Sequence, residues 1–537
     1  MFHASLALVL VFRVFQPAQA QESAVVDLGY AQYQGVFDGT TNVTSFLGIR
    51  YAAAPVGDLR WQGPSSPSNQ SGLQRADTEQ PWCPQAGQGT SPSNPFLSVG
   101  SQIAKRQTIE TSEDCLFLNV FYPGATVSSE SSPVIVWIHG GGYIGGFASG
   151  YEGSDLISQS NDGVVVVVIQ YRLGLFGFLS GNEVHANGAL NAGLLDQNFA
   201  LRWVNRHISK FGGDPAQVTI WGLSAGAGSV LQHIIAENGQ TSPQLFRGAI
   251  TSSTFLPSQY GFNDTIPQAL YHQVVDSVNC TTAQDTLACL RKADTTALQT
   301  ANTNINLAAF FGTFAFVPVV DGTFIKQRPI EALKEGKVNG EALLAVTNTN
   351  EGDLFVNQTA SPLNASQYAA ELYPELRSQD TAKIAQLYGS SGSAVTQENL
   401  IMGESIFICP SYYLLNAFQT HSYKGEYAVL PALHGGEFTL YWPSFGRRFG
   451  IPIPFNNTDF INAFAQPFIN FAISLDPNAK VDPSNITPKW DLYSTDNTEM
   501  VFNKTAENLP DIHADTTNEA LLERCRFWES VGALTGQ

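Results

Sequence analysis

The sequence predicts an α/β fold in which a large, mostly parallel β-sheet is covered by helices on both faces. The first observation is a set of continuous apolar runs, such as residues 134–138 and 164–169, which are typical of strands buried on both faces of a sheet. The second is that helix-like segments stand between these runs, which indicates one α/β architecture rather than separate modules. Because 43% of the 537 residues are hydrophobic, a disordered or fibrous chain is excluded.

The predicted strands follow one another along the chain, at residues 134–138, 164–169, 218–221, 342–346 and 427–430. The run 164–169 consists of five Val and one Ile, and so many β-branched side chains disfavour a helix. The last two runs carry the weakest strand pattern.

Two helices are predicted between and after these strands. The first covers residues 191–210, because apolar residues recur on one face until Gly212-Gly213 ends the helix. The second begins just after Ser224 and extends to about Glu237.

The charge pattern excludes nucleic-acid binding. The formal net charge is −19, only 14% of residues are charged, and the chain contains no basic run, so the electrostatic signature of a nucleic-acid partner is missing. The composition is that of an acidic exported protein.

The first twenty residues predict a secretory signal peptide. Residues 4–12 form an apolar run that is too short to span a membrane, and Ala18-Gln19-Ala20 fits a small-x-small cleavage site. We therefore expect a mature chain that starts at Gln21 and forms one domain over 21–537. Candidate glycosylation sites are Asn42, Asn69, Asn263, Asn357, Asn364, Asn456, Asn485 and Asn503.

The six cysteines, an even number in an exported chain, predict three disulfides. They are Cys83, Cys115, Cys280, Cys289, Cys409 and Cys525. Their spacing gives no zinc motif, so no metal site is predicted.

A Gly-x-Ser-x-Gly motif, Gly222-Leu223-Ser224-Ala225-Gly226, follows the apolar run 218–221 directly and precedes the second predicted helix. A strand–turn–helix context of this kind is what a nucleophile elbow requires. The two glycines leave room where strand and helix crowd each other, and the Ser is held with its hydroxyl exposed. We interpret Ser224 as a catalytic nucleophile rather than part of an ordinary glycine-rich turn.

The glycine run His139-Gly140-Gly141-Gly142 follows the strand 134–138. Glycines allow backbone N–H groups to approach and stabilise an oxyanion. The run also matches the dinucleotide fingerprint, but further glycines downstream disfavour the helix that this fingerprint needs.

A serine nucleophile needs a base, and the base needs an orienting acid, in the chain order Ser, acid, His. His421, His434 and His513 lie far enough downstream, and His434 is favoured because it follows a strand-like run and precedes two glycines. Glu351 and Asp353 both follow the strand 342–346, and the residues alone do not choose between them.

Taken together, these motifs resemble the type-B carboxylesterase family, also called the cholinesterase/lipase family, and in particular secreted fungal carboxylesterases and lipases. The resemblance covers essentially the whole mature chain. It is carried by Ser112-Glu113-Asp114-Cys115-Leu116, Trp137-Ile138-His139-Gly140-Gly141-Gly142, Gly193-Leu194-Leu195-Asp196-Gln197, Phe211-Gly212-Gly213-Asp214-Pro215 and the serine motif.

The resemblance implies an α/β-hydrolase fold and hydrolysis of carboxylic esters without a metal or organic cofactor. It selects Glu351, because the family's acid is a Glu before Gly, and His434, which stands in a His-Gly-x-Glu context. The oxyanion donors become the N–H groups of Gly141, Gly142 and Ala225. The disulfides implied are Cys83–Cys115, Cys280–Cys289 and Cys409–Cys525, and the structural ion pairs are Arg60–Glu113 and Arg172–Asp196.

The sequence departs from the family pattern at three places. Leu223 stands where the family commonly has Glu, which makes the site more apolar. The 83–115 loop contains no Trp, which argues against a choline-ester preference. The acyl pocket is expected near Gly312 and Phe314, where Gly312 replaces a bulky aromatic and predicts a roomier pocket.

Two other functions compete with ester hydrolysis in solution. An interfacial lipase or sterol esterase would use the 83–115 loop as a lid, because Phe96, Val99 and Ile103 share helical spacing within residues 95–105, and such a lid would contact a lipid surface transiently. A non-catalytic adhesion homologue is disfavoured, because all three catalytic positions are intact.

Overall fold

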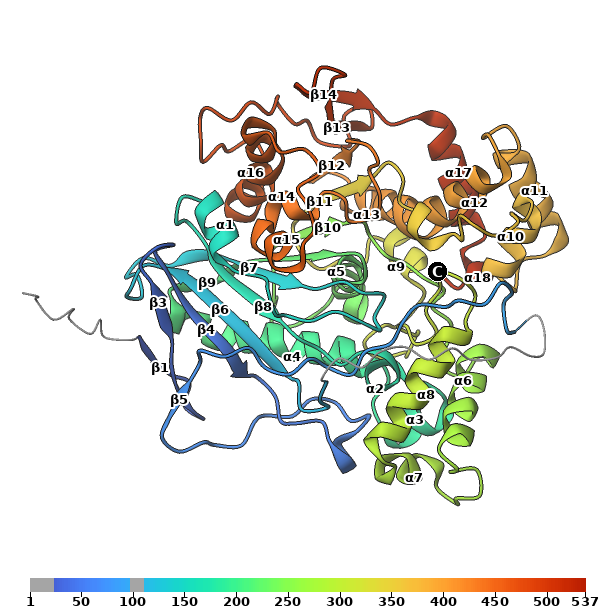
Figure 1. Ribbon diagram of the computed structural model, residues 1–537, viewed down its shortest axis with the longest axis horizontal. Helices are drawn as coiled ribbons and strands as arrows, with labels where there is room; N and C mark the ends of the chain where they lie inside the picture. The colour runs from blue at the N-terminus through green and yellow to red at the C-terminus, as the bar shows by residue number, and fades with distance from the viewer. Residues whose placement is uncertain (1–23, 97–110) are drawn as a thin grey trace, which may run out of the picture.

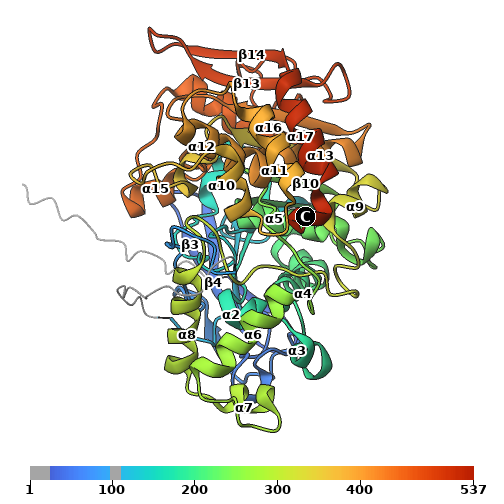
Figure 2. The same ribbon diagram turned by 90° about the vertical axis from the view of Figure 1, so that its right-hand side faces the viewer.

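The computed structural model describes residues 24–96 and 111–537. The predicted signal peptide and residues 97–110 of the predicted lid loop therefore lie outside the described residues. An eleven-stranded sheet runs through the molecule in the order β14-β13-β12-β11-β10-β9-β7-β8-β6-β4-β3, with helices on both sides (Figures 1 and 2). A separate three-stranded sheet has the order β1-β2-β5.

The strands have the following bounds: β1 Val25–Asp27, β2 Gln32–Gln34, β3 Val36–Asp38, β4 Val43–Arg50, β5 Leu73–Arg75, β6 Phe117–Pro123, β7 Ser132–Ile138, β8 Val165–Ile169, β9 Gly213–Leu223, β10 Gly248–Ser252, β11 Ala342–Asn348, β12 Ser422–Tyr427, β13 Thr498–Lys504 and β14 Pro510–Thr516.

The α-helices have the following bounds: α1 Ser154–Gln159, α2 Gly174–Phe178, α3 Asn182–Asn187, α4 Ala192–His207, α5 Ala225–Ile235, α6 Thr265–Ser277, α7 Thr286–Lys292, α8 Thr295–Ala308, α9 Pro329–Lys334, α10 Ala365–Leu372, α11 Ser378–Tyr388, α12 Ala394–Gly403, α13 Cys409–Phe418, α14 Phe438–Tyr441, α15 Pro443–Phe449, α16 Thr458–Ser474, α17 Glu519–Ser530 and α18 Gly532–Thr535.

The predicted parallel sheet is confirmed. Each neighbouring pair from β8 through β7, β9, β10, β11 and β12 to β13 is parallel, and the pairs at both ends are antiparallel. Alternate residues of β7 enter two different cores. Val134, Val136 and Ile138 belong to one, whereas Ile135 and Trp137 belong to the other. A strand that is buried on both faces explains why its sequence is continuously apolar.

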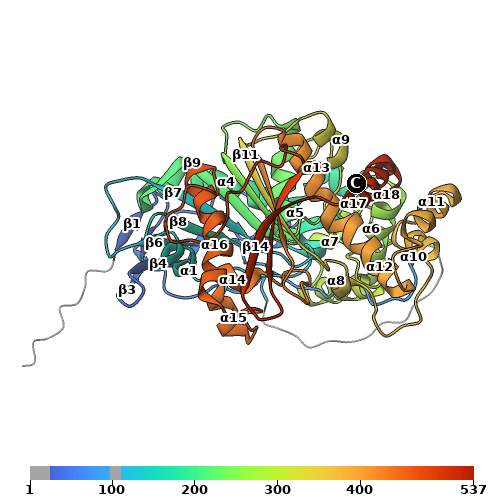
Figure 3. The same ribbon diagram turned by 90° about the horizontal axis from the view of Figure 1, so that it is seen from above.

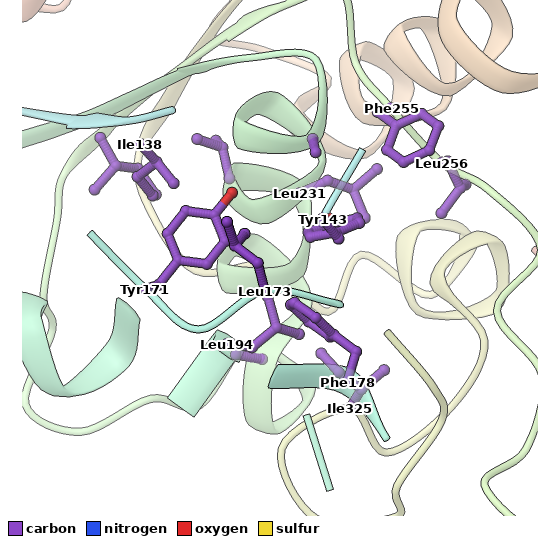
Figure 4. Packing of buried hydrophobic residues seen from close by; sticks show 14 of the residues in the cluster. Ile138, Tyr143, Tyr171, Leu173, Phe178, Leu194, Leu231, Phe255, Leu256 and Ile325 are labelled. Carbon is purple, nitrogen blue, oxygen red and sulfur yellow. The ribbon is translucent and has the colours of Figure 1, made fainter. Parts of the chain in front are cut away.

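The two cores lie on opposite faces of the sheet. One includes buried side chains of α4, α5 and α13, and the other includes buried side chains of α1, α14 and α16 (Figure 3). In the first core, the side chains of Tyr143 and Phe178 pack with ring centroids 5.1 Å apart close to Leu231 of α5 (Figure 4). The loop that carries the predicted oxyanion donors is thus anchored against the helix that follows Ser224.

One strand prediction is wrong. The strand expected at 427–430 lies earlier, at β12, where it pairs with β11 up to Tyr427. Lys424 interrupts the apolar run that would have marked β12 as a buried strand. Its fully buried ammonium lies 3.4 Å from Glu499 and donates to Thr347. A buried lysine with polar partners breaks the apolar run that marks a two-sided strand.

The six cysteines form the three disulfides that the resemblance implies, Cys83–Cys115, Cys280–Cys289 and Cys409–Cys525. Both implied ion pairs are also present, each with a closest N–O distance of 2.6 Å: Arg60–Glu113 and Arg172–Asp196. Within the described residues, no helix is long and apolar enough to cross a membrane.

The structure speaks against one glycosylation candidate. The side chain of Asn485 is buried and its amide nitrogen donates to Asn462 O at 2.8 Å and to Gln466 Oε1 at 2.7 Å. A glycan on this nitrogen would displace both partners, so the folded chain has no room for it. The sequence motif reports only the residue types and not their burial.

Acid is expected to weaken the contribution of His233 to stability. Burial lowers its pKa to about 3, whereas an unfolded histidine titrates near 6.5. Between these values the unfolded chain binds a proton that the folded chain does not, so stability is lost as the pH falls through this window.

Substitution His233→Gln removes that group. We expect the stability advantage of the wild type over the variant to shrink by about 1.4 kcal/mol per pH unit below pH 6. Thermal unfolding of both proteins at pH 7 and pH 4.5 measures this. A difference in Tm that is the same at both pH values would contradict the expectation.

Candidate active site

Ser224 lies at the sharp turn between β9 and α5. Its backbone has φ 59° and ψ −125°, a strained conformation for a residue with a side chain. The turn is held because Ser224 N–H donates to Ser252 O at 2.9 Å and Gly228 N–H donates to Ser224 O at 2.8 Å. Strain of this kind at a turn is typical of functional residues.

Both glycines of the serine motif are required by close backbone approach. A Cβ on Gly222 would lie 2.3 Å from the carbonyl carbon of Gly226, and a Cβ on Gly226 would lie 2.0 Å from Ile138 O. Neither distance is tolerable for a real side chain. The motif therefore lets α5 begin directly against β9 and β7, which brings Ala225 N–H beside Ser224.

The glycine run after β7 forms a tight loop. Gly141 and Gly142 have φ of +111° and +63°, and Ile144 N–H and Gly145 N–H both donate to Gly141 O, at 3.1 and 2.8 Å. Glycine adopts positive φ without strain, so this tight loop leaves its backbone N–H groups able to face the cavity, as an anion site needs. This loop lines the same cavity as Ser224.

His434 and Glu351, which are distant in sequence, form a direct pair. Nδ1 of His434 lies 2.6 Å from Oε2 of Glu351. The other oxygen of Glu351 accepts from Asn348 N–H at 2.7 Å. This geometry makes Nδ1 the protonated nitrogen, and it leaves Nε2 with a lone pair.

Ser224 and His434 line one cavity, but no hydrogen bond joins Ser224 Oγ to His434 Nε2. Nε2 is buried and has no hydrogen-bond partner among the described residues. A loose nucleophile–base contact is common in structures without substrate, and an unsatisfied buried nitrogen marks the point at which a proton is to be accepted.

The competing residues lie elsewhere. His421 Nε2 is bonded to Leu475 O at 3.1 Å, and His513 is partly exposed on β14 and pairs with Asp511. Asp353, the alternative acid, forms no hydrogen bond or ion pair with His434, and burial raises its pKa. The structure thus brings Glu351, not Asp353, to the histidine.

A second buried carboxylate, Glu437, lies next to this pair. Asn348 Nδ2 donates to Glu437 Oε2 at 2.8 Å, and Tyr441 OH donates to Glu437 Oε1 at 3.0 Å. Burial, reinforced by the negative charge of Glu351, raises the pKa of Glu437. Asn348 contacts both acids, a role that no motif in the sequence indicates.

The cavity at Ser224 has a volume of about 500 Å³ and an apolar lining. None of the described residues that line it is Asp, Glu, Lys or Arg. Its aromatic lining residues are Phe147, Tyr151, Phe314, Phe355, Phe438 and Phe445, and Leu223 stands beside the nucleophile. Such walls suit uncharged substrates.

Gly312 does not open this cavity. A Cβ on Gly312 would lie 2.0 Å from Phe355 O. The backbone of Phe355 therefore occupies the space beside Gly312 in which a larger acyl pocket was expected. Gly312 instead lines a second apolar cavity of about 130 Å³. Phe314 lines both cavities, and a Cβ on Gly142 would lie 2.2 Å from its ring.

No group of three or more His, Cys, Asp or Glu side chains arranged to hold a metal ion occurs within residues 24–96 and 111–537.

Known proteins share this architecture. A family model described as the carboxylesterase family matches residues 22–528. Carboxylesterase patB of Penicillium expansum is 29% identical over 530 residues, covering 88% of this chain and 92% of that protein. A secreted triacylglycerol lipase of Gibberella zeae is 29% identical over 519 residues, covering 88% and 86%. The crystal structure of Aspergillus niger EstA superposes with a TM-score of 0.82 at 30% identity, covering 96% of this chain and 99% of that one.

Proposed function

Because the chain belongs to the carboxylesterase family, and is a carboxylic ester hydrolase with the α/β-hydrolase fold, we propose that Ser224, His434 and Glu351 are its catalytic triad. The observation that carries this proposal is the 2.6 Å contact between Glu351 and His434, because His434 lines the same cavity as the strained Ser224. Abolition of p-nitrophenyl ester hydrolysis by Ser224→Ala tests it.

The proposed reaction proceeds through an acyl-enzyme. His434 Nε2 accepts the Ser224 Oγ proton while Oγ attacks the ester carbonyl carbon, and the same proton then passes to the leaving alcohol. Water repeats the cycle and releases the acid. Glu351 holds His434 in the tautomer that leaves Nε2 free and stabilises its charged form.

The N–H groups of Gly141, Gly142 and Ala225 are proposed to bind the oxyanion that forms at the carbonyl. The positive φ values of the two glycines and the start of α5 at Ala225 support this role. Each such donor is worth about 10²–10³ in turnover.

We also propose that the enzyme is exported, with cleavage after Ala20. The amino-terminal apolar run, the three disulfides and the secreted relative support this, since disulfides persist in oxidising compartments.

The substrate is proposed to be an uncharged ester, with Phe314 as the wall of the acyl pocket. Substitution Phe314→Ala would join the two apolar cavities. We expect the ratio of kcat/KM for p-nitrophenyl octanoate to that for p-nitrophenyl acetate to rise about tenfold or more, since even one methylene in an apolar pocket is worth that factor.

Phe316→Ala is the matched control, because Phe316 lines only the second cavity. An unchanged ratio in Phe314→Ala would remove Phe314 from the acyl pocket.

An interfacial lipase is the second candidate, favoured by the apolar cavity and by the lipase relative. Hydrolysis of an emulsified triglyceride above its solubility limit tests it. A rate that jumps at this limit supports the lipase, whereas simple saturation supports an esterase for dissolved substrates.

A further inference from the structure

One side chain from the segment that follows Cys83 holds Gly146, at the end of the loop 139–146 that carries two of the proposed oxyanion donors. Gln85 Oε1 accepts from Gly146 N–H at 2.8 Å, and Gln85 Nε2 donates to Gly146 O at 2.8 Å and to Cys83 O at 2.9 Å. Both backbone polar groups of Gly146 are therefore satisfied by a single carboxamide, which fixes the position and the plane of the backbone there.

Gly146 in turn is pressed against the residues that carry the proposed oxyanion donors. It has φ +107°, and a Cβ on it would lie 2.2 Å from both Gly140 O and His139 Nδ1. The adjacent Gly145 N–H donates to Gly141 O at 2.8 Å. A shift of Gly146 would therefore be passed on to the Gly140–Gly141 peptide, whose N–H is one of the donors.

The segment that carries Gln85 is itself well anchored. Cys83 is disulfide-bonded to Cys115, Gln299 Nε2 donates to Gln85 O at 2.6 Å, and Ala86 N–H donates to Ile144 O at 2.8 Å. The ring of Trp82 stacks on Phe147 at 3.7 Å between centroids. Gln85 thus connects the segment that is fixed by the Cys83–Cys115 disulfide to the loop that contains Gly146.

We propose that Gln85 is a positioning residue for ester hydrolysis, which keeps the Gly141 and Gly142 N–H groups aimed at the developing oxyanion by fixing Gly146. The inference rests on the proposed function, because it assumes that these N–H groups form the oxyanion hole. Among the described residues of this segment, Ala86 and Gln88 line the cavity and Gln85 does not, so it acts on the loop and not on the substrate.

The test replaces Gln85 with Met, which has a similar length but cannot pair with Gly146. We expect kcat for an oxygen ester to fall about 10- to 100-fold with little change in KM, because misaligned donors lose stabilisation that is realised only in the transition state. Gln74→Met is the matched control, since the Gln74 carboxamide also donates to two backbone carbonyls, those of Ser71 and Gly72, on another loop.

A thionoester of the same acid and alcohol separates donor alignment from a general loss of structure. Sulfur is a weak hydrogen-bond acceptor, so the wild type should prefer the oxygen ester strongly, and Gln85→Met should lose most of this preference. Rates are normalised by active-site titration. A smaller folded fraction then changes neither the kcat of the variant relative to the wild type nor the ratio of oxygen-ester to thionoester rates. If Gln85→Met does not fold, Gln85→Asn, which is one methylene too short to make the same contacts, is expected to show the same loss.

The outcomes distinguish the two proposals. A folded Gln85→Met (or, failing that, Gln85→Asn) enzyme with the wild-type oxygen-to-thiono ratio would overturn the role of Gln85. A wild-type enzyme that shows no preference for the oxygen ester would instead overturn the proposed oxyanion hole.

Discussion

Substitution Ser224→Ala is expected to lower ester turnover by about 10⁵- to 10⁶-fold, leaving the small rate that binding and oxyanion donors alone supply. The loss is large because no other hydroxyl occupies the turn between β9 and α5, where the backbone is held in the strained conformation that presents Oγ to the cavity. Stopped-flow and steady-state hydrolysis of p-nitrophenyl butyrate measures it.

Ser530→Ala provides the control for Ser224→Ala. Ser530 is exposed on α17 and its hydroxyl donates to Phe527 O, so full activity is expected. The thermal unfolding of Ser224→Ala should stay close to that of the wild type. Retention of more than about one hundredth of the wild-type rate in the folded variant would contradict the role of a nucleophile.

Substitution Glu351→Gln is expected to lower turnover by about 10⁴-fold, as loss of the orienting carboxylate does in serine hydrolases. One oxygen of Glu351 accepts from Asn348, through its backbone N–H and more weakly through its amide, and the other accepts from His434 Nδ1. An amide in its place has only one oxygen. The backbone N–H of Asn348 can only donate and keeps that oxygen, so the NH₂ faces His434 Nδ1, which can become an acceptor. The neutral His434 then carries its proton on Nε2, and Nε2 can no longer accept the proton of Ser224.

Asp353→Asn is the matched control for Glu351→Gln, because both acids follow β11 but only Glu351 reaches His434. We expect near wild-type turnover in Asp353→Asn. If the two substitutions exchanged their effects, the acid of the triad would be Asp353.

Burial on both faces made four of the eleven strands of the large sheet predictable from the sequence, whereas β10 and the strands toward both edges were not predicted. The strands β7, β8, β9 and β11 were recognisable because each contains a largely apolar run. The strand β12 was misplaced in the prediction because Lys424 has buried polar partners that no local pattern reveals. Element boundaries depend on such partners, which come from other parts of the chain.

The site was predictable to a different extent. Gly222 and Gly226 predict the nucleophile elbow, because a larger residue at either position would clash with the neighbouring backbone. The residues alone did not choose between Glu351 and Asp353, and the resemblance to a family did. Gly312 lines the second cavity and not the one at Ser224, and its close approach to the backbone of Phe355 is not visible in the sequence.

Peptide mapping after reaction with a p-nitrophenyl alkylphosphonate tests the central claim most directly. A phosphonate reacts with an activated serine and leaves a stable adduct, which mass spectrometry assigns to a residue. We predict one adduct, on Ser224, that is absent from Ser224→Ala and forms much more slowly in Glu351→Gln. An adduct on another residue, or labelling that persists in Ser224→Ala, would contradict the account.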